Sequence, residues 1–151
     1  MQWGGTADIG AAQEMFDACL HAGIRHFDTA FIYTDGRSEE FLGAIAGNRD
    51  DVFVATKAAY NQPATSTNIR ASFDMSRKRL KRDCVDLLYL HRFDDETPLE
   101  QTFEALAGLQ SDGAIRFIGV SNYAAWQVMK AQSVAAKFEI KIDVIQLVWV
   151  I

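Results

Sequence analysis

The sequence has few cysteines and no long apolar run. Its 151 residues include two cysteines, Cys19 and Cys84, which lie far apart and belong to no Cys-x-x-Cys pair. This usage predicts small core side chains in a reducing compartment, so we expect a cytoplasmic protein. No stretch approaches the roughly 18 apolar residues of a membrane-spanning helix, and no signal-peptide pattern follows Met1. We therefore expect no association with a membrane.

The sequence also lacks an excess of positive charge. Its formal net charge is −5, which gives no support to nucleic-acid binding. The one basic run, residues 77–82, closes a predicted helix, where cations complement the helix dipole and face solvent. His21 and His26 lack the spacing of metal ligands, so we predict no metal site. With 49% hydrophobic and 23% charged residues, the composition is typical of one soluble domain with a core.

Two glycine motifs of nucleotide-binding open sheets are missing. No Gly-x-Gly-x-x-Gly follows the first strand, and no Gly-x-x-x-x-Gly-Lys occurs anywhere. Strands and helices nevertheless alternate, with one unit about every 30 residues, which is typical of a parallel α/β fold. From their apolar runs, strands are expected at residues 24–27, 52–56, 85–90, 117–120 and 143–150, with residues 1–5 as the tail of an earlier strand.

Capping residues and glycines mark the helices between these strands. The run Thr97-Pro98-Leu99-Glu100 has the form of a capping box, with proline at the first helical position. Gly23 and Gly113 each stand where a helix is expected to stop. The expected caps are Asp8, Ser38, Thr67 and Thr97.

Residues 26–43 contain two side chains that look misplaced on structural grounds. Asp28 follows an apolar strand, where a carboxylate without a partner is costly to bury. Tyr33 lies just beyond it, in a loop that turns at Asp35-Gly36 before the next helix. An acid at a strand end with a phenol five residues later suits a proton-transfer site. A capping Asp28 and a half-buried Tyr33 are the alternative reading of this stretch.

Further polar side chains stand at the ends of later strands. The residues at strand ends are Asp28, Lys57, His91, Ser121 and Asn122, and Gln146 lies within the last strand. In a parallel barrel such ends meet at one mouth, where active sites are built. The pattern therefore favours a parallel (α/β)8 TIM barrel over an open sheet.

A series of motifs in fixed order covers nearly the whole chain. They are Phe27-Asp28-Thr29-Ala30, Tyr33 with Gly36 and Glu39, Leu42-Gly43, Thr56-Lys57, Asp86-Leu87-Leu88-Tyr89-Leu90-His91, Gly119-Val120-Ser121-Asn122 and Gln146. Through them the sequence resembles the aldo-keto reductase family, and their order and spacing make the match specific. The resemblance implies an (α/β)8 barrel that reduces aldehydes and ketones with NADPH.

The same resemblance implies roles for individual residues. The catalytic tetrad would be Asp28, Tyr33, Lys57 and His91. The residues that hold the nicotinamide carboxamide of NADP would be Ser121, Asn122 and Gln146. The substrate would be a small-molecule carbonyl compound.

The chemistry of these side chains supports the same roles. A free tyrosine is a weak acid at neutral pH, and a neighbouring Lys57 ammonium would favour the phenolate form of Tyr33. Asp28 would hold the lysine charged and in place, and His91 could orient the carbonyl by a hydrogen bond. The cofactor would supply the hydride, and the protein would supply its placement.

The length of the chain is short for this fold. An (α/β)8 barrel needs roughly 200–250 residues, and residues 1–151 hold about six of eight βα units. We therefore expect one aldo-keto reductase domain truncated at both ends, with a curved six-stranded parallel sheet and helices on its outer face. Because the late loops that hold the pyrophosphate and adenosine are missing, we expect this piece alone to bind NADPH weakly and to be poorly active or inactive.

Two other functions fit parts of the pattern. A Schiff-base lyase on the same barrel would use Lys57 as its nucleophile, but Tyr33, Asn122 and Gln146 would then have no evident role. The resemblance also includes non-catalytic barrels that act as regulatory subunits of potassium channels and retain the tetrad.

Overall fold

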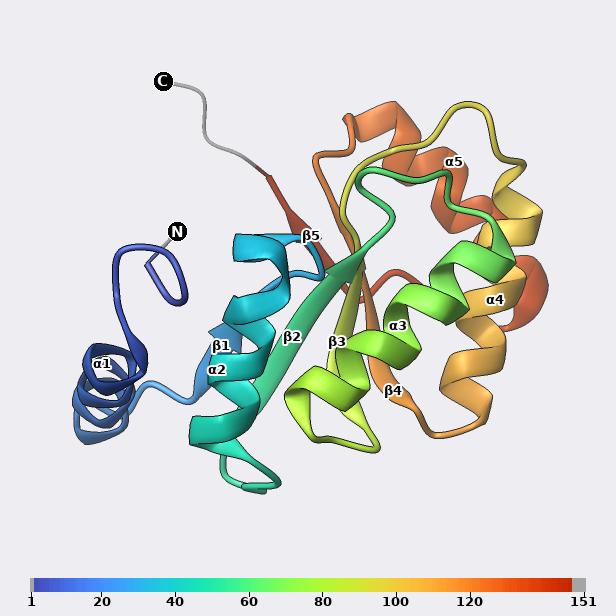
Figure 1. Ribbon diagram of the computed structural model, residues 1–151. Coiled ribbons are helices and arrows are strands. Elements are labelled where there is room, and N and C mark those ends of the chain that lie inside the picture. The colour runs from blue at the N-terminus through green and yellow to red at the C-terminus, as the bar shows by residue number, and fades with distance from the viewer. Residues whose placement is uncertain (1, 148–151) are drawn as a thin grey trace.

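Among residues 2–147, which the computed structural model describes, five parallel strands form one sheet (Figure 1). The strands pair in chain order, β1-β2-β3-β4-β5, and each pairing is parallel. They are β1 His26–Asp28, β2 Phe53–Ala58, β3 Val85–Leu90, β4 Ile115–Ser121 and β5 Val144–Gln146. The sheet curls into a half-barrel, so the predicted incomplete (α/β) TIM barrel is confirmed.

Helices alternate with the strands and pack in chain order. They are α1 Ile9–His21, α2 Arg37–Ala46, α3 Ser66–Leu80, α4 Leu99–Ser111 and α5 Ala125–Ala135, with short 3-10 turns η1 Tyr33–Gly36 and η2 Ala136–Phe138. Each helix from α2 to α5 contacts the helix before it. This side-by-side order is that of a barrel wall. None of the helices in the described part of the chain has the length and apolar character needed to cross a membrane.

The core lies mainly between the sheet and this row of helices. Val54, Leu88 and Val120 from three neighbouring strands are fully buried against Phe73 of α3 and Phe103 of α4. β3 is buried along its whole length, as expected for a strand covered on both faces.

The opposite face of the sheet carries a smaller apolar cluster. Ala55, Leu87 and Tyr89 form this cluster, with Phe53 and Val144 partly buried around it. Because side chains alternate between faces, Lys57 shares this inner face with Phe53 and Ala55. The inner face is therefore polar where Lys57 lies and apolar at the cluster beside it.

Two strand predictions are wrong in part. Residues 2–7 form a turn, because Gly4 adopts a positive φ of 71° and the amides of Gly5 and Ala7 both donate to the carbonyl of Gln2. The described sheet therefore has five strands rather than six. The strand expected at 24–27 begins at His26, because the Ile24 amide still donates to the carbonyl of Cys19. The last expected strand is present at 144–146, and residues 148–150 lie outside the described residues.

The helix caps are predicted with mixed success. Asp8 caps α1, as expected, by accepting from the amide of Ala11 at 2.9 Å. Ser38 caps no helix, because α2 starts directly after the left-handed Gly36 and the Ser38 hydroxyl accepts from Thr29 instead. Thr67 lies inside α3, which Thr65 caps. The Thr97 hydroxyl donates to a loop carboxylate, so the expected capping box is absent there.

Candidate active site

The predicted strand-end residues come together at one edge of the half-barrel. Asp28 ends β1, Ser121 ends β4, and Gln146 ends β5. Lys57 is the last residue but one of β2, and His91 follows β3 directly. Since all five strands are parallel and in register, these side chains share the C-terminal edge of the sheet.

Lys57 is the centre of this group. Its side chain is only 2% exposed, and its ammonium forms an ion pair with Asp28 and donates to the carbonyl of Thr29 at 3.0 Å. The ammonium also lies 5.0 Å from the centre of the Tyr33 ring and 5.6 Å from that of Tyr89. A buried charge is tolerated only with such partners.

A glycine on β4 makes room beneath the lysine. Lys57, Tyr89 and Gly119 occupy one row across three strands, because Lys57 pairs with Tyr89 and Tyr89 with Gly119. A Cβ added at Gly119 would overlap the Tyr89 ring. The absence of that Cβ therefore leaves space for the Tyr89 ring, whose centre lies 5.6 Å from the Lys57 ammonium.

Tyr33 reaches the site from a short loop rather than from a strand. It begins η1, and its amide donates to the carbonyl of Ala30 at 3.0 Å. Its ring meets the His91 ring edge-on, with 5.7 Å between the ring centres. Tyr33 thus contacts both Lys57 and His91, and its half-buried ring keeps access to solvent.

His91 is buried and contacts two tyrosine rings. Its ring centre lies 4.7 Å from that of Tyr60, in addition to its edge-on contact with Tyr33. Burial, aided by the Lys57 charge and opposed by Asp28, lowers the pKa of His91 to about 4. The imidazole is therefore neutral at neutral pH and can donate from one ring nitrogen and accept at the other.

Ser121, Asn122 and Gln146 form a hydrogen-bonded row that joins the catalytic candidates. The Asn122 side chain donates to the carbonyl of His91 at 2.9 Å and to the Ser121 hydroxyl at 3.1 Å. The Ser121 hydroxyl lies 3.5 Å from the Gln146 amide oxygen, and the Gln146 amide donates to Asp28 at 3.2 Å. Asn122 adopts a left-handed φ of 58°, a region that asparagine enters more easily than most residues.

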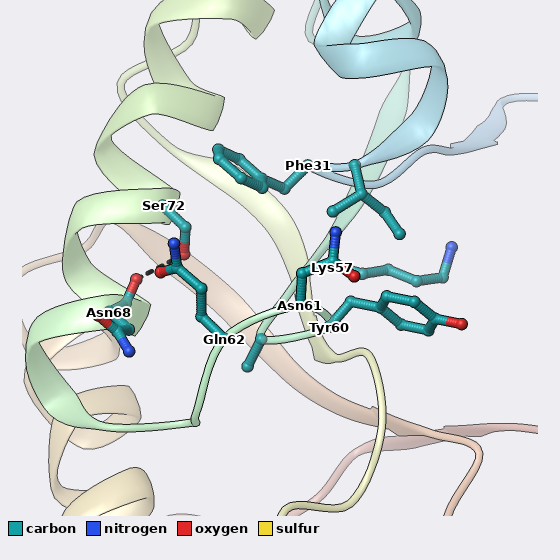
Figure 2. A pocket seen from close by; sticks show the side chains of 9 residues that line it. Phe31, Lys57, Tyr60, Asn61, Gln62, Asn68 and Ser72 are labelled. Carbon is teal, nitrogen blue, oxygen red and sulfur yellow. Dashed lines mark hydrogen bonds between the residues drawn. The ribbon is translucent and has the colours of Figure 1, made fainter.

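A pocket of about 140 Å³ opens beside Lys57. Figure 2 shows Phe31 and Tyr60 among its labelled side chains, together with polar residues of the loop after β2 and of helix α3. The polar residues are Asn61, Gln62, Asn68 and Ser72. No motif and no predicted strand end marks residues 61–63, so the sequence alone does not predict that they line the site.

No cluster of three or more potential metal-ligating side chains occurs among residues 2–147. The polar side chains of the site are instead a hydroxyl, two carboxamides, an imidazole, a phenol and one ion pair. Such groups suit hydrogen bonding and proton transfer.

Comparison with known proteins identifies the family. The model of the Aldo/keto reductase family matches residues 1–151. The chain belongs to the aldo/keto reductase family. The family match and the half-barrel agree, since the strand order and the helices are those of an incomplete barrel of this family.

Individual relatives cover most of this chain. It is 37% identical over 134 residues to "Aflatoxin B1 aldehyde reductase member 2" of Rattus norvegicus, and this match covers 85% of the chain and 36% of the relative. It is 38% identical over 143 residues to "Aldo-keto reductase YhdN" of Bacillus subtilis (strain 168), and this match covers 88% of the chain and 43% of the relative. It is 32% identical over 148 residues to "Probable voltage-gated potassium channel subunit beta" of Oryza sativa subsp. japonica, and this match covers 91% of the chain and 45% of the relative. The chain thus spans less than half the length of these relatives.

Proposed function

We propose that the complete gene product that carries residues 1–151 is an NADP-dependent aldo-keto reductase, which reduces an aldehyde or ketone to an alcohol. The observation that supports this best is the Lys57–Asp28 ion pair, whose buried ammonium lies 5.0 Å from the centre of the Tyr33 ring, while the His91 ring meets the Tyr33 ring edge-on. A phenol in contact with an ammonium and an imidazole is suited to donate a proton to a carbonyl oxygen.

Each of the four residues has a role in this proposal. Tyr33 donates the proton to the substrate oxygen, and the positive charge of Lys57 stabilises the phenolate that remains. Asp28 holds the Lys57 ammonium in place through their ion pair. His91 is neutral because its pKa is lowered to about 4, so it orients the carbonyl by a hydrogen bond without competing as an acid.

The nicotinamide cofactor, proposed to be NADP, supplies the hydride when bound. Ser121, Asn122 and Gln146 offer one hydroxyl and two carboxamides along the edge next to Asp28. Such groups can both donate to and accept from the carboxamide of a nicotinamide. The row therefore fits a role in fixing the nicotinamide ring beside the substrate.

The test is reductase activity of the purified complete gene product. The loss of NADPH absorbance is followed with a panel of small aldehydes and ketones, and the alcohol product is measured. Tyr33→Phe should lower turnover at least about 100-fold and leave NADPH binding nearly unchanged, because the phenol acts on the substrate oxygen. Tyr123→Phe is the matched control, since it also removes a tyrosine hydroxyl, its ring packs on Phe93, and Tyr123 has no role in the proposed reaction. Near-normal turnover in Tyr33→Phe would make the acid assignment wrong.

A Schiff-base lyase is a weaker candidate for the same site. Its lysine must be a free amine at the moment of attack, whereas the Lys57 nitrogen is held by Asp28 and by the Thr29 carbonyl. Borohydride trapping of a carbonyl compound on Lys57, followed by mass spectrometry, would support the lyase and count against the reductase.

The channel-subunit name of the rice relative supports a third candidate, a regulatory barrel. That relative is 32% identical across 91% of this chain. Co-purification of the complete gene product with a potassium channel, together with the absence of carbonyl reduction, would favour this function.

A further inference from the structure

Glu39 carries a buried charge that the proposed chemistry does not use. It lies in the first turn of α2, and its side chain is 0% exposed. One carboxylate oxygen accepts from the Thr56 hydroxyl at 2.6 Å, and the other accepts from Arg79 at 3.2 Å. Because burial of a charge is costly, a buried carboxylate is expected to have partners for both oxygens, and Glu39 has them.

Arg79 carries the same network from α3 to the loop that holds Tyr33. Its guanidinium donates to the carbonyl of Phe31 at 3.1 Å and lies 4.8 Å from the centre of the Phe31 ring. On the other side of Tyr33, a Cβ added at Gly36 would overlap this guanidinium. Arg79 therefore contacts the loop both before and after Tyr33.

The loop needs such support because its backbone is strained. Thr34 and Asp35 adopt left-handed φ values of 51° and 57°, and Gly36 follows at 89°. A β-branched residue such as threonine rarely adopts this region, and strained residues persist only where the surroundings hold them. Tyr33 directly precedes this strained run.

The other end of the network reaches the lysine. Thr56, whose hydroxyl donates to Glu39, is the residue before Lys57 on β2. One buried carboxylate thus connects the strand of Lys57 with the arginine that holds the Tyr33 loop. We propose that Glu39 and Arg79 are positioning residues that fix the Tyr33 ring against the Lys57 ammonium. The kinetic part of this inference rests on the proposed reductase function.

The first experiment measures the loop itself and needs no activity. Hydrogen–deuterium exchange with mass spectrometry is compared in the complete gene product and its Thr56→Val, Glu39→Gln and Glu100→Gln variants. Glu100 forms an exposed ion pair with Lys137 at 3.0 Å, so Glu100→Gln is a matched control for loss of a carboxylate. Glu39→Gln should raise amide exchange in residues 31–36 about tenfold or more, while the control leaves it unchanged. Unchanged exchange there in a folded Glu39→Gln protein would overturn the proposal.

The second experiment separates positioning from general stability. In Glu39→Gln the turnover number should fall about 10- to 100-fold, while the affinity for NADPH is kept, because a small displacement of the acid affects only the chemical step. A merely structural loss would lower turnover and NADPH binding capacity together, and that result would overturn the proposal.

A substitute variant and the wild-type activity complete the test. If Glu39→Gln does not fold, Thr56→Val takes its place, since it removes one hydrogen bond and keeps the charges of Glu39 and Arg79. Its turnover number should fall by a smaller factor, again with the affinity for NADPH kept. If the unaltered protein reduces no carbonyl compound, the proposed function fails. The exchange in residues 31–36 then supports or overturns the positioning role by itself.

Discussion

His91 is buried beside the Lys57 ammonium, and both effects make its protonation costly in the folded protein, while Asp28 opposes them. Its pKa falls from 6.5 to about 4, so the unfolded chain binds a proton at a higher pH than the folded chain does. Stability therefore rises with pH across this window, and the contribution of His91 is lost as pH falls from 6.5 towards 4.

The prediction is a pH-dependent difference between the unaltered protein and His91→Asn. The free energy of unfolding, from urea titrations, should fall more steeply between pH 6.5 and 4 in the unaltered protein. The excess is at most about 3 kcal/mol, since one pKa unit corresponds to about 1.4 kcal/mol. Carboxylates titrate in both proteins, so their contribution cancels in the comparison. Parallel curves for the two proteins would contradict the prediction.

The Lys57–Asp28 pair leads to a second prediction at the level of single residues. The Lys57 side chain is 2% exposed and that of Asp28 29%. Asp28→Asn leaves a buried ammonium without its counter-charge and should cost about 3 kcal/mol of stability. Lys57→Met removes the buried charge and leaves a carboxylate that reaches water, so it should cost less than about 1 kcal/mol. Urea unfolding of both variants checks the order, and equal losses would count against this account of the pair.

The positions of the candidate site residues were largely predictable from the sequence, because each follows an apolar strand or falls in a family motif. Glu39 also falls in one of these motifs, but neither the motif nor the neighbouring sequence predicts its role. An acid in the first turn of a helix usually faces solvent and complements the helix dipole. Its burial is decided by Arg79, 40 residues later, which no local pattern connects with it. Tyr60 was missed for a related reason, since a loop fold rather than a strand end brings it to His91.

At the level of helices, the crossing of α2 and α3 depends on Gly43. A Cβ added there would overlap the backbone of Arg79 and Leu80. Alanine normally favours a helix over glycine by roughly 1 kcal/mol, but here the two backbones would have to separate.

The third prediction is therefore a reversal of helix propensity. Gly43→Ala should destabilise the protein by about 1–3 kcal/mol in thermal or urea unfolding. Gly10→Ala in α1 is the matched control, because its nearest neighbour is a side-chain oxygen of Asp8 at 3.4 Å, and it should be neutral or slightly stabilising. A stabilised Gly43→Ala protein would show that the helices can move apart at little cost.

Strand and helix positions were predictable because apolar runs and helical spacing are local signals. Their ends were less so. Ser38 and Thr67 have the chemistry of helix caps, yet α2 and α3 start one or more residues earlier. The strained run after Tyr33 fixes where α2 can begin, and Thr65 already supplies the oxygen at α3. Competition among neighbouring residues that can cap a helix thus sets where each helix begins.

The whole half-barrel exposes apolar side chains on its inner side and near its last strand. Phe117, Ile145 and Leu147 are all exposed, and β1 and β5 each pair with one neighbour in the described sheet. Exposed apolar surface and unpaired strand edges both favour association.

The fourth prediction concerns residues 1–151 expressed alone. Sedimentation should show dimers or larger species at micromolar concentration, and Phe117→Ser should shift the distribution towards monomer, because it removes exposed apolar surface. A stable monomer under the same conditions would mean that the inner face is better protected than its exposure indicates.

The hydrogen bond between Gln146 and Asp28 joins the last described strand to the first and spans 118 positions of the chain. At synthesis rates of about 5–20 residues per second, the ribosome adds Gln146 on the order of ten seconds after Asp28. Lys57 is added early in that interval and becomes available to Asp28, whereas the row of Ser121, Asn122 and Gln146 is complete only at its end. A nascent chain should therefore be able to form the ion pair of the site well before it can complete the row proposed to bind the cofactor.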